Sequence, residues 1–203
     1  MVWYACYGSN IDETRFLAYL QGGELTTYNG HIKPYDGCKQ DASKPRDAKP
    51  FLLNRKLLFA EESSTWDYHG VAFISNRKSQ QPKTFSKIYL ISKVQFNHLF
   101  ASENGRPTVN IEYDSLFKKG YLNFNFRFYN KIILIDKSYE GFPIITFTNS
   151  KRLPFNKPCK EYLSYIMKGI VSSHGISKED CVDYLVKAKA GFKRKELYDF
   201  WRS

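Results

Sequence analysis

The first twelve residues constrain the fold more than any other stretch of this chain. Residues 2–7, Val-Trp-Tyr-Ala-Cys-Tyr, carry no charge and are rich in aromatic and β-prone side chains, which is typical of a buried strand. The turn formers Gly8-Ser9-Asn10 follow, and Asn10 with Glu13 three residues later has the form of a helix capping box. The stretch therefore predicts a strand that passes through a tight loop into a helix, and we expect this helix to end at Gly22-Gly23.

The loop between that strand and that helix has two interpretations. A strand that runs through Gly8-Ser9 into a helix N-terminus leaves several backbone N–H groups without an intrahelical partner. Such a loop suits an anion, or a carbonyl oxygen that becomes anionic during a reaction. An ordinary corner between a strand and a helix has the same pattern, and the residue types alone do not separate the two.

Length and composition are those of a folded protein. The chain has 203 residues, of which 42% are hydrophobic and 25% are charged, enough to build a core. We expect a single domain over residues 1–203, with a long loop near 26–54 and an insertion near 76–84. No apolar run approaches the roughly eighteen residues of a membrane helix, and the N-terminus has no basic region before its apolar stretch, as a signal peptide would. We therefore expect a cytoplasmic protein without a membrane partner.

The net charge of +11 raises the question of nucleic-acid binding. The excess lies in three patches, 44–56, 77–87 and 187–202, of which the first two have the composition of exposed loops. A basic patch beside an aromatic residue such as Trp201 can bind a phosphate backbone and stack bases. Neither an RNP-type strand nor a zinc-finger spacing accompanies the patches. The pattern therefore favours solvated basic loops over a nucleic-acid partner.

The metal-ligating residue types are scattered. The four cysteines, Cys6, Cys38, Cys159 and Cys181, form no Cys-x-x-Cys pair, and the four histidines do not cluster in the sequence. This spacing predicts neither a zinc site nor, in a reducing compartment, a disulfide. Cys6 lies inside the first predicted strand, where a cysteine usually serves as a small buried hydrophobe. No GxSxG, P-loop or HExxH motif is present, so we expect no metal and no cofactor.

The rest of the chain alternates between strand and helix patterns. Strands are predicted at 56–60, 68–74, 85–91, 121–128, 131–136 and 142–148. Helical spacing covers 162–170, and a last helix opens at Ser177. The segment from Thr26 to Asn54 shows little periodicity and is interpreted as a long connection, of the kind that is often functional or mobile.

A helix predicted to begin after Ser92, with Gln95 as its capping-box partner, carries an acidic residue at its end. Phe96 and Phe100 lie on a buried helix face, and Glu103 comes seven residues after Phe96, about two turns along the same face. A carboxylate beside apolar neighbours is a candidate acid/base group. A solvated glutamate at a fraying helix end fits the pattern as well.

Several of these features together resemble the gamma-glutamylcyclotransferase-like superfamily. The segment Tyr4-Ala5-Cys6-Tyr7-Gly8-Ser9-Asn10 is similar to its Tyr-Gly-Ser-Asn signature, and an acidic residue, Glu103, stands downstream before Asn104-Gly105. The likeness also covers residues 70–73, 91–105, 142–148 and 158–185, and so extends over nearly the whole chain. Cys6 departs from the small apolar residue more usual at its position, and the strong positive charge is not a feature of the superfamily.

This resemblance implies an α+β fold, with a compact, mixed β-barrel-like core, surrounding helices and a cavity beside the first loop. It implies that Glu103 is the catalytic residue and faces the Gly8-Ser9 loop across that cavity. The residues implied to bind the substrate are Tyr4, Ala5, Cys6, Tyr7, Gly8, Ser9, Asn10 and Tyr162. The implied activity is the cyclisation of a gamma-glutamyl amine to 5-oxoproline, with release of an amine or amino acid and without metal or cofactor. The expected partner is thus a small gamma-glutamyl molecule.

Three hypotheses from different classes follow from the sequence. The first is this enzyme, the second a non-catalytic binding module that uses the same pocket as a sensor, and the third a nucleic-acid-associated protein that uses its basic face. The presence of Glu103 favours the enzyme over the sensor. The segments near 26–54 and 76–84 are longer than in a minimal superfamily member, so the leaving group cannot be carried over. The sequence does not determine the oligomeric state either.

Overall fold

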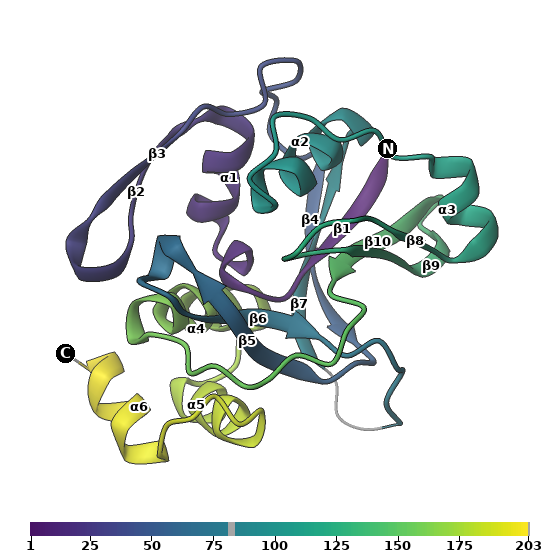
Figure 1. Ribbon diagram of the computed structural model, residues 1–203. Coiled ribbons are helices and arrows are strands. Elements are labelled where there is room, and N and C mark those ends of the chain that lie inside the picture. The colour runs from purple at the N-terminus through teal and green to yellow at the C-terminus, as the bar shows by residue number, and fades with distance from the viewer. Residues whose placement is uncertain (81–83, 203) are drawn as a thin grey trace.

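The computed structural model describes residues 1–80 and 84–202 of the chain (Figure 1). Its strands are β1 (Val2–Cys6), β2 (Gly23–Thr26), β3 (Ile32–Tyr35), β4 (Asp47–Leu53), β5 (Leu57–Ser63), β6 (His69–Ile74), β7 (Thr84–Ile91), β8 (Tyr121–Asn123), β9 (Lys131–Tyr139) and β10 (Phe142–Thr148). Its helices are α1 (Glu13–Gln21), α2 (Lys93–Glu103), α3 (Tyr113–Lys119), α4 (Lys160–His174), α5 (Lys178–Lys187) and α6 (Arg194–Arg202), with the 3-10 turns η1 (Ser9–Ile11), η2 (Tyr28–Gly30) and η3 (Ser64–Trp66). In the described part of the chain, no helix has both the length and the apolarity that crossing a bilayer requires.

A six-stranded mixed sheet forms the centre of the fold, in the order β4-β7-β1-β10-β9-β8. β1 pairs antiparallel with β7, so that Trp3 lies opposite Leu90, and parallel with β10, so that Trp3 lies opposite Ile144. All five residues of β1 are buried, which confirms the predicted buried strand. Two further hairpins, β2–β3 and β5–β6, lie outside the sheet. The α+β class predicted from the sequence is confirmed.

Helices α1 and α2 cover the face of β1 that carries Tyr4. The ring centroid of Tyr4 lies 5.8 Å from that of Phe16 in α1 and 5.8 Å from that of Phe96 in α2. Both phenylalanines are fully buried, and burying a side chain of this size stabilises a fold by roughly 1.5–3 kcal/mol. This packing holds α1 and α2 against each other (Figure 1). It also brings the loop after β1 close to the end of α2.

The predicted capping box of α1 is wrong. Asn10 and Glu13 do not cap the helix; instead the carboxylate of Asp12 accepts a hydrogen bond from the N–H of Arg15 at 2.9 Å. The turn η1 delays the helix, because the N–H of Ile11 bonds back to the carbonyl of Gly8. The side chain of Asn10 is thereby left available for another partner. The predicted end of the helix is confirmed, since α1 stops before Gly22, which has φ +80°.

The predicted capping box of α2 is confirmed. The hydroxyl of Ser92 accepts a hydrogen bond from the N–H of Gln95, and the Gln95 side chain accepts one from the N–H of Ser92. The helix begins at Lys93 and ends at Glu103, as its local sequence predicts.

The interpretation of residues 26–54 as a long connection is wrong in part. This segment contains β3 and β4, and β4 forms seven residue pairs with β7 from Asp47 to Leu53. Pro34 and Pro50 obscure the strand pattern, because proline cannot donate a ladder hydrogen bond. β4 tolerates its proline as an edge strand of the sheet. The basic patch at 44–56 is therefore largely strand, not loop.

The strand predicted at 121–128 is also shorter than expected. Only Tyr121–Asn123 pairs in the sheet, with β9. After it, the rings of Phe124 and Phe126 stack at 5.5 Å and pack on Phe100 of α2, at 4.9 and 5.8 Å. The alternating phenylalanines of this segment are therefore explained by packing against α2 and not by pairing in the sheet. The sequence pattern did not predict helices α3 and α6.

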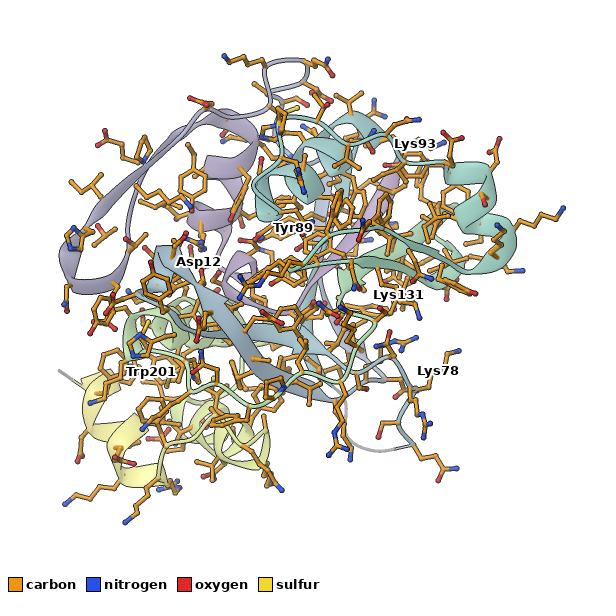
Figure 2. All side chains as sticks on the ribbon, in the orientation of Figure 1. Asp12, Lys78, Tyr89, Lys93, Lys131 and Trp201 are labelled. Carbon is orange, nitrogen blue, oxygen red and sulfur yellow. The ribbon has the colours of Figure 1, made fainter. Side chains whose placement is uncertain are left out.

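The basic side chains are distributed over several elements. Lys87, in the second basic patch, is buried in β7 with its amine 2.8 Å from the carboxylate of Glu13. Figure 2 shows Lys93, Lys131 and Lys78 one below another on the right-hand side of the view, on different segments of the chain. Part of the insertion predicted near 76–84, residues 81–83, lies outside the described residues.

Candidate active site

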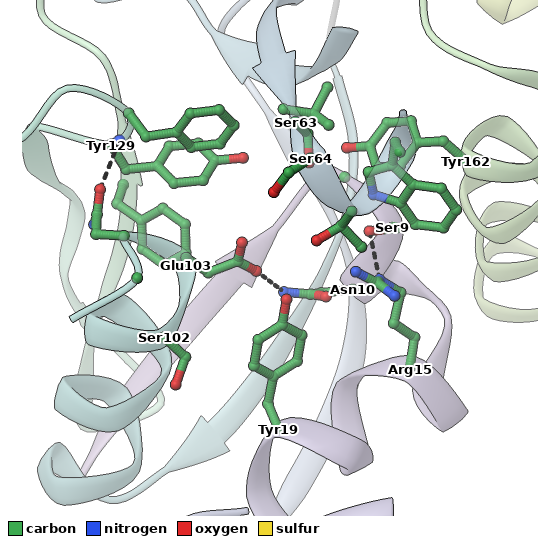
Figure 3. A pocket seen from close by; sticks show the side chains of 18 of the residues that line it. Ser9, Asn10, Arg15, Tyr19, Ser63, Ser64, Ser102, Glu103, Tyr129 and Tyr162 are labelled. Atoms are coloured by element: carbon green, nitrogen blue, oxygen red, sulfur yellow. Dashed lines mark hydrogen bonds between the residues drawn. The ribbon is translucent and has the colours of Figure 1, made fainter. Parts of the chain in front are cut away.

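A cavity of about 440 Å³ opens beside the loop that follows β1. Its walls come from β1, η1, α1, β3, the β5–η3 segment, the end of α2, the segment 126–129 and α4 (Figure 3). These elements are far apart in the sequence, so the cavity exists only in the folded chain. A concave site with a few convergent polar groups is the usual form of a small-molecule site.

Glu103 and Asn10 meet at this cavity. The amide nitrogen of Asn10 donates a hydrogen bond to Oε1 of Glu103 at 2.9 Å, across 93 positions of sequence (Figure 3). Glu103 is half-buried and lines the same cavity as Gly8 and Ser9. The two segments that the resemblance singled out are therefore brought together around one space. The Oδ1 atom of Asn10 is buried and has no hydrogen-bond partner among the described residues.

The end of α2 is held in place by the residue after Glu103. The side chain of Asn104 donates to the carbonyl of Phe100 at 2.9 Å and accepts from the N–H of Tyr129 at 2.9 Å. The chain then turns away at Gly105, which has φ +61°. Because both contacts fix the last helical turn, the carboxylate of Glu103 projects from a rigid element and not from a frayed end.

Gly8 lies where a side chain would not fit. A Cβ atom at this position would lie 2.8 Å from the phenolic oxygen of Tyr162 and 3.3 Å from Cβ of Ala72. The same phenolic oxygen accepts a hydrogen bond from the N–H of Ala72 at 2.9 Å. Burial raises the pKa of Tyr162 above its ordinary value, so the phenol is neutral over the physiological range. Tyr162 therefore presses against the bare backbone of the loop.

Six of the eight residues predicted to bind substrate line the cavity, namely Tyr4, Tyr7, Gly8, Ser9, Asn10 and Tyr162. Ala5 and Cys6 do not, and for these two the structure differs from the expectation. The carbonyl of Ala5 accepts from the hydroxyl of Thr146 at 2.6 Å, and the thiol of Cys6 donates to the carbonyl of Lys87 at 3.1 Å. Burial raises the pKa of the Cys6 thiol to about 12, so it is a neutral group of the sheet.

Two cationic residues of the cavity were missed in the sequence. Arg15, in the first turn of α1, is 3% exposed and donates from Nε to the hydroxyl of Ser9 at 2.8 Å. Lys33, in β3, donates to the hydroxyl of Thr65 at 2.7 Å, and burial lowers its pKa. The helical spacing of Arg15 and Tyr19, four residues apart, is a signal that could have placed both on one face. Lys33 gave no such signal, because its segment was interpreted as a loop.

Among the described residues, no three histidine, cysteine, aspartate or glutamate side chains lie close enough together to hold a metal ion. The polar groups of the cavity are instead one half-buried carboxylate, tyrosine and serine hydroxyls, an asparagine amide and several cationic groups. Such a set can move protons and bind anions.

Comparison with known proteins gives the fold. A solved gamma-glutamyl cyclotransferase superposes over 100% of this chain and 99% of its own, with a TM-score of 0.50 and 16% identity. YkqA from Bacillus subtilis superposes over 93% of this chain and 54% of its own, also with a TM-score of 0.50, at 14% identity. The chain has the gamma-glutamyl cyclotransferase-like fold. At this level of identity the likeness shows the fold alone, and it confirms the resemblance seen in the sequence to that extent.

Sequence comparison adds one curated relative. The chain is 30% identical over 218 aligned positions to a protein from Arabidopsis thaliana named Histone deacetylase 5. The alignment covers 92% of this chain but only 30% of the relative. No protein-family model matches the chain. The chain thus spans about a third of the length of this relative, whose name belongs to the longer protein.

Proposed function

We propose that the chain cyclises a gamma-glutamyl compound to 5-oxoproline and releases an amine or amino acid. The observation that supports this most is the pairing of Glu103 with Asn10 at 2.9 Å, on the wall of a cavity that also contains the Gly8-Ser9 loop. A proton-transfer group and an anion-binding loop then act on one bound molecule.

In this reaction the substrate supplies its own nucleophile. Glu103 takes a proton from the α-ammonium of the gamma-glutamyl group, and the freed amine attacks the side-chain carbonyl carbon. A ring carbon–nitrogen bond forms, and the carbonyl oxygen becomes an oxyanion that the loop around Gly8 and Ser9 stabilises. The bond to the leaving nitrogen then breaks as that nitrogen takes the proton from Glu103. The ring nitrogen gives up its second proton, which the released amine carries away as an ammonium. Atoms and charges balance without another reactant.

The shape of the site suits this role. Folding a flexible glutamyl chain into a near-ring geometry has an entropic cost, which rigid walls offset by holding the reacting groups together. The rings of Tyr4 and Phe147, stacked at 5.4 Å, give the cavity such a wall. A second cavity of about 430 Å³ shares Lys33, Ser64 and Thr65 with the first. We assign this neighbouring space to the leaving group.

A binding module without catalysis is the second candidate, because the same cavity and loop suit a sensor of small anions. The half-buried carboxylate of Glu103 is the feature that favours an enzyme, since an anion sensor gains nothing from it. For nucleic acid, the spread of lysines over several elements gives no support beyond the net charge (Figure 2). The deacetylase named by the Arabidopsis relative is not proposed, since the chain spans about a third of that protein.

The test uses a panel of gamma-glutamyl amines, amino acids and peptides, with 5-oxoproline as the measured product. Glu103→Gln keeps the shape of the site and removes its acid/base function, so turnover is expected to fall by about a hundredfold or more. The melting temperature should stay equal or rise slightly, because a partly buried charge is replaced by a neutral group. Glu62→Gln is the matched control, since Glu62 is an exposed carboxylate on the same cavity, and it should keep its activity.

Undiminished turnover in Glu103→Gln would rule out this residue as the base. Tight binding of one panel member with no 5-oxoproline from any of them would favour the sensor instead.

A further inference from the structure

Arg15 is the most deeply buried charge on the cavity. Its side chain is 3% exposed, and its guanidinium lies 5.0 Å from the ring centroid of Trp66 and 5.5 Å from that of Tyr165. Its Nη1 atom is buried and has no hydrogen-bond partner, and no carboxylate among the described residues forms an ion pair with it. Aromatic faces offset only part of the cost of burying a cation. An anion in the cavity would therefore meet a positive charge that has no ion-pair partner among the described residues.

Ser9 connects this charge to the cavity. The hydroxyl of Ser9 accepts the hydrogen bond from Nε of Arg15 at 2.8 Å, and both residues line the cavity. A hydroxyl carries one proton and two lone pairs. Because one lone pair of the Ser9 oxygen accepts the Arg15 N–H, the hydroxyl is oriented and polarised to donate its own proton. No described residue is recorded as the acceptor of that proton. Ser9 thus offers a hydrogen-bond donor to a bound molecule.

The opposite charge of the cavity lies on the other side of Asn10. Figure 3 shows Asn10 between Glu103, which comes from α2, and the Ser9–Arg15 pair, which joins the loop to α1. The site therefore has the Glu103 carboxylate on one side of the Asn10 amide, and on the other side the Ser9 hydroxyl with its hydrogen-bonded Arg15 guanidinium. A free α-amino acid head has the complementary arrangement, because an ammonium and a carboxylate share one carbon.

We propose that Ser9 and Arg15 form the subsite for the α-carboxylate of the substrate, while Glu103 faces its α-ammonium. This assignment rests on the proposed function and concerns which residues recognise the α-carboxylate of its gamma-glutamyl substrate. Ser9 contacts the carboxylate. Arg15 is a positioning residue that orients the Ser9 hydroxyl and supplies the charge behind it.

The experiment measures binding by isothermal titration calorimetry with two probes that differ only at this group. The probes are 5-oxoproline and its neutral carboxamide, 5-oxoprolinamide. A charge-assisted hydrogen bond corresponds to a preference of about ten- to a hundredfold, so the unmodified chain should bind 5-oxoproline more tightly by that factor. Arg15→Met should lose the preference and Arg15→Lys should keep part of it. Lys33→Met, which removes another cation of the same cavity, should keep most of it.

Because Arg15 also packs on Trp66, melting temperatures are measured for every variant. Ser9→Ala keeps the guanidinium and removes the hydroxyl, which is both the donor to the ligand and the acceptor of the Arg15 Nε hydrogen bond. It decides the matter if Arg15→Met does not fold. For turnover, Arg15→Met should raise KM much more than it lowers kcat, with recovery in Arg15→Lys. A purely structural role would instead lower the melting temperature and affect both probes equally.

Equal binding of the two probes by the unmodified chain overturns the subsite, as does a preference that survives in folded Ser9→Ala and Arg15→Met. The outcome is separable from that of the proposed function. A carboxylate preference without any 5-oxoproline formation would support the subsite and contradict the proposed enzymatic function. Turnover that depends on Glu103 without a carboxylate preference would support the enzymatic function and contradict the subsite.

Discussion

The cavity has two walls that are built in different ways. The catalytic wall, which carries Asn10 and Glu103, comes from the ends of β1 and α2. Its helix α2 starts at a capping box that four residues, 92–95, specify. The hairpin wall, which carries Lys33 and Thr65, comes from β3 and the segment after β5, two hairpins outside the central sheet. Contacts between distant segments hold the second wall, such as the hydrogen bond of Lys33 to Thr65 at 2.7 Å.

The two walls differ in how well the local sequence predicts them. In capped, amphipathic elements, the residues that specify the element lie within one or two helical turns of one another. A wall made by two hairpins that meet in space carries few such signals, because its contacts join residues that are far apart in the sequence. We also expect the walls to differ in function: chemistry on the catalytic wall and recognition of the leaving group on the hairpin wall. Three sets of substitutions test this division.

The largest effect is expected from Gly8→Ala on the catalytic wall. The backbone of Gly8 has φ −105° and ψ −151°, which any residue adopts, so the effect is steric. The added methyl would lie 2.8 Å from the Tyr162 hydroxyl. Crowding should destabilise the fold by about 1–3 kcal/mol, and the displaced loop should lower turnover by about a hundredfold. Denaturant unfolding and 5-oxoproline release measure the two effects.

Tyr162→Phe provides the control for this clash, since it removes the oxygen that the methyl would meet. In a double-mutant cycle the two changes should be less harmful together than the sum of their separate effects. Strict additivity would mean that the loop does not press on Tyr162, and that Gly8 has another role.

A smaller and more selective effect is expected from Asn10→Ala set against Asp12→Ala. Asn10 holds Glu103, so its loss should lower turnover by about tenfold, the scale of a hydrogen bond to a charged group, with little change in stability. Asp12 caps α1, so its loss should cost about 0.5–2 kcal/mol of stability with little change in kcat. The reverse pattern would restore Asn10 as the helix cap.

The smallest effect is expected from Lys33→Met on the hairpin wall. Burial lowers the pKa of Lys33 in the folded chain, so its protonated form is disfavoured by folding. At neutral pH the lysine is charged in both states and this cost is fully present; it fades as the pH rises through the lowered folded pKa toward the ordinary 10.5. The melting temperature of the variant relative to that of the unmodified chain should therefore be highest at neutral pH and should fall in alkaline buffer, whatever the loss of the hydrogen bond to Thr65 costs at both. A relative melting temperature that rises with pH would contradict this assignment.

On turnover, Lys33→Met should change KM by only a few-fold and leave kcat nearly unchanged, since a half-exposed charge contributes little. A loss of turnover as large as that expected for Glu103→Gln would contradict the division of function between the two walls.

Much of the catalytic wall could be predicted from the sequence. The uncharged run of β1 indicated a strand buried on both faces, and Ser92 with Gln95 gave the start of α2. The spacing from Phe96 placed Glu103 on the inward face, where it lines the cavity. The strands β3 and β4 could not be predicted, because Pro34 and Pro50 break the usual pattern and only an edge or hairpin position accommodates them.

The sequence by itself determined the elements whose hydrogen bonds close within four residues, because covalent geometry and side-chain size set those bonds. It also determined which face of each element is apolar. The tertiary structure alone decided the partners of those polar side chains that bond outside their own helical turn. Asn10 could cap a helix or hold Glu103, and Arg15 could lie in water or under Ser9. Those choices depend on which distant segments the packing of the whole sheet brings within 3 Å, and no local pattern contains that information.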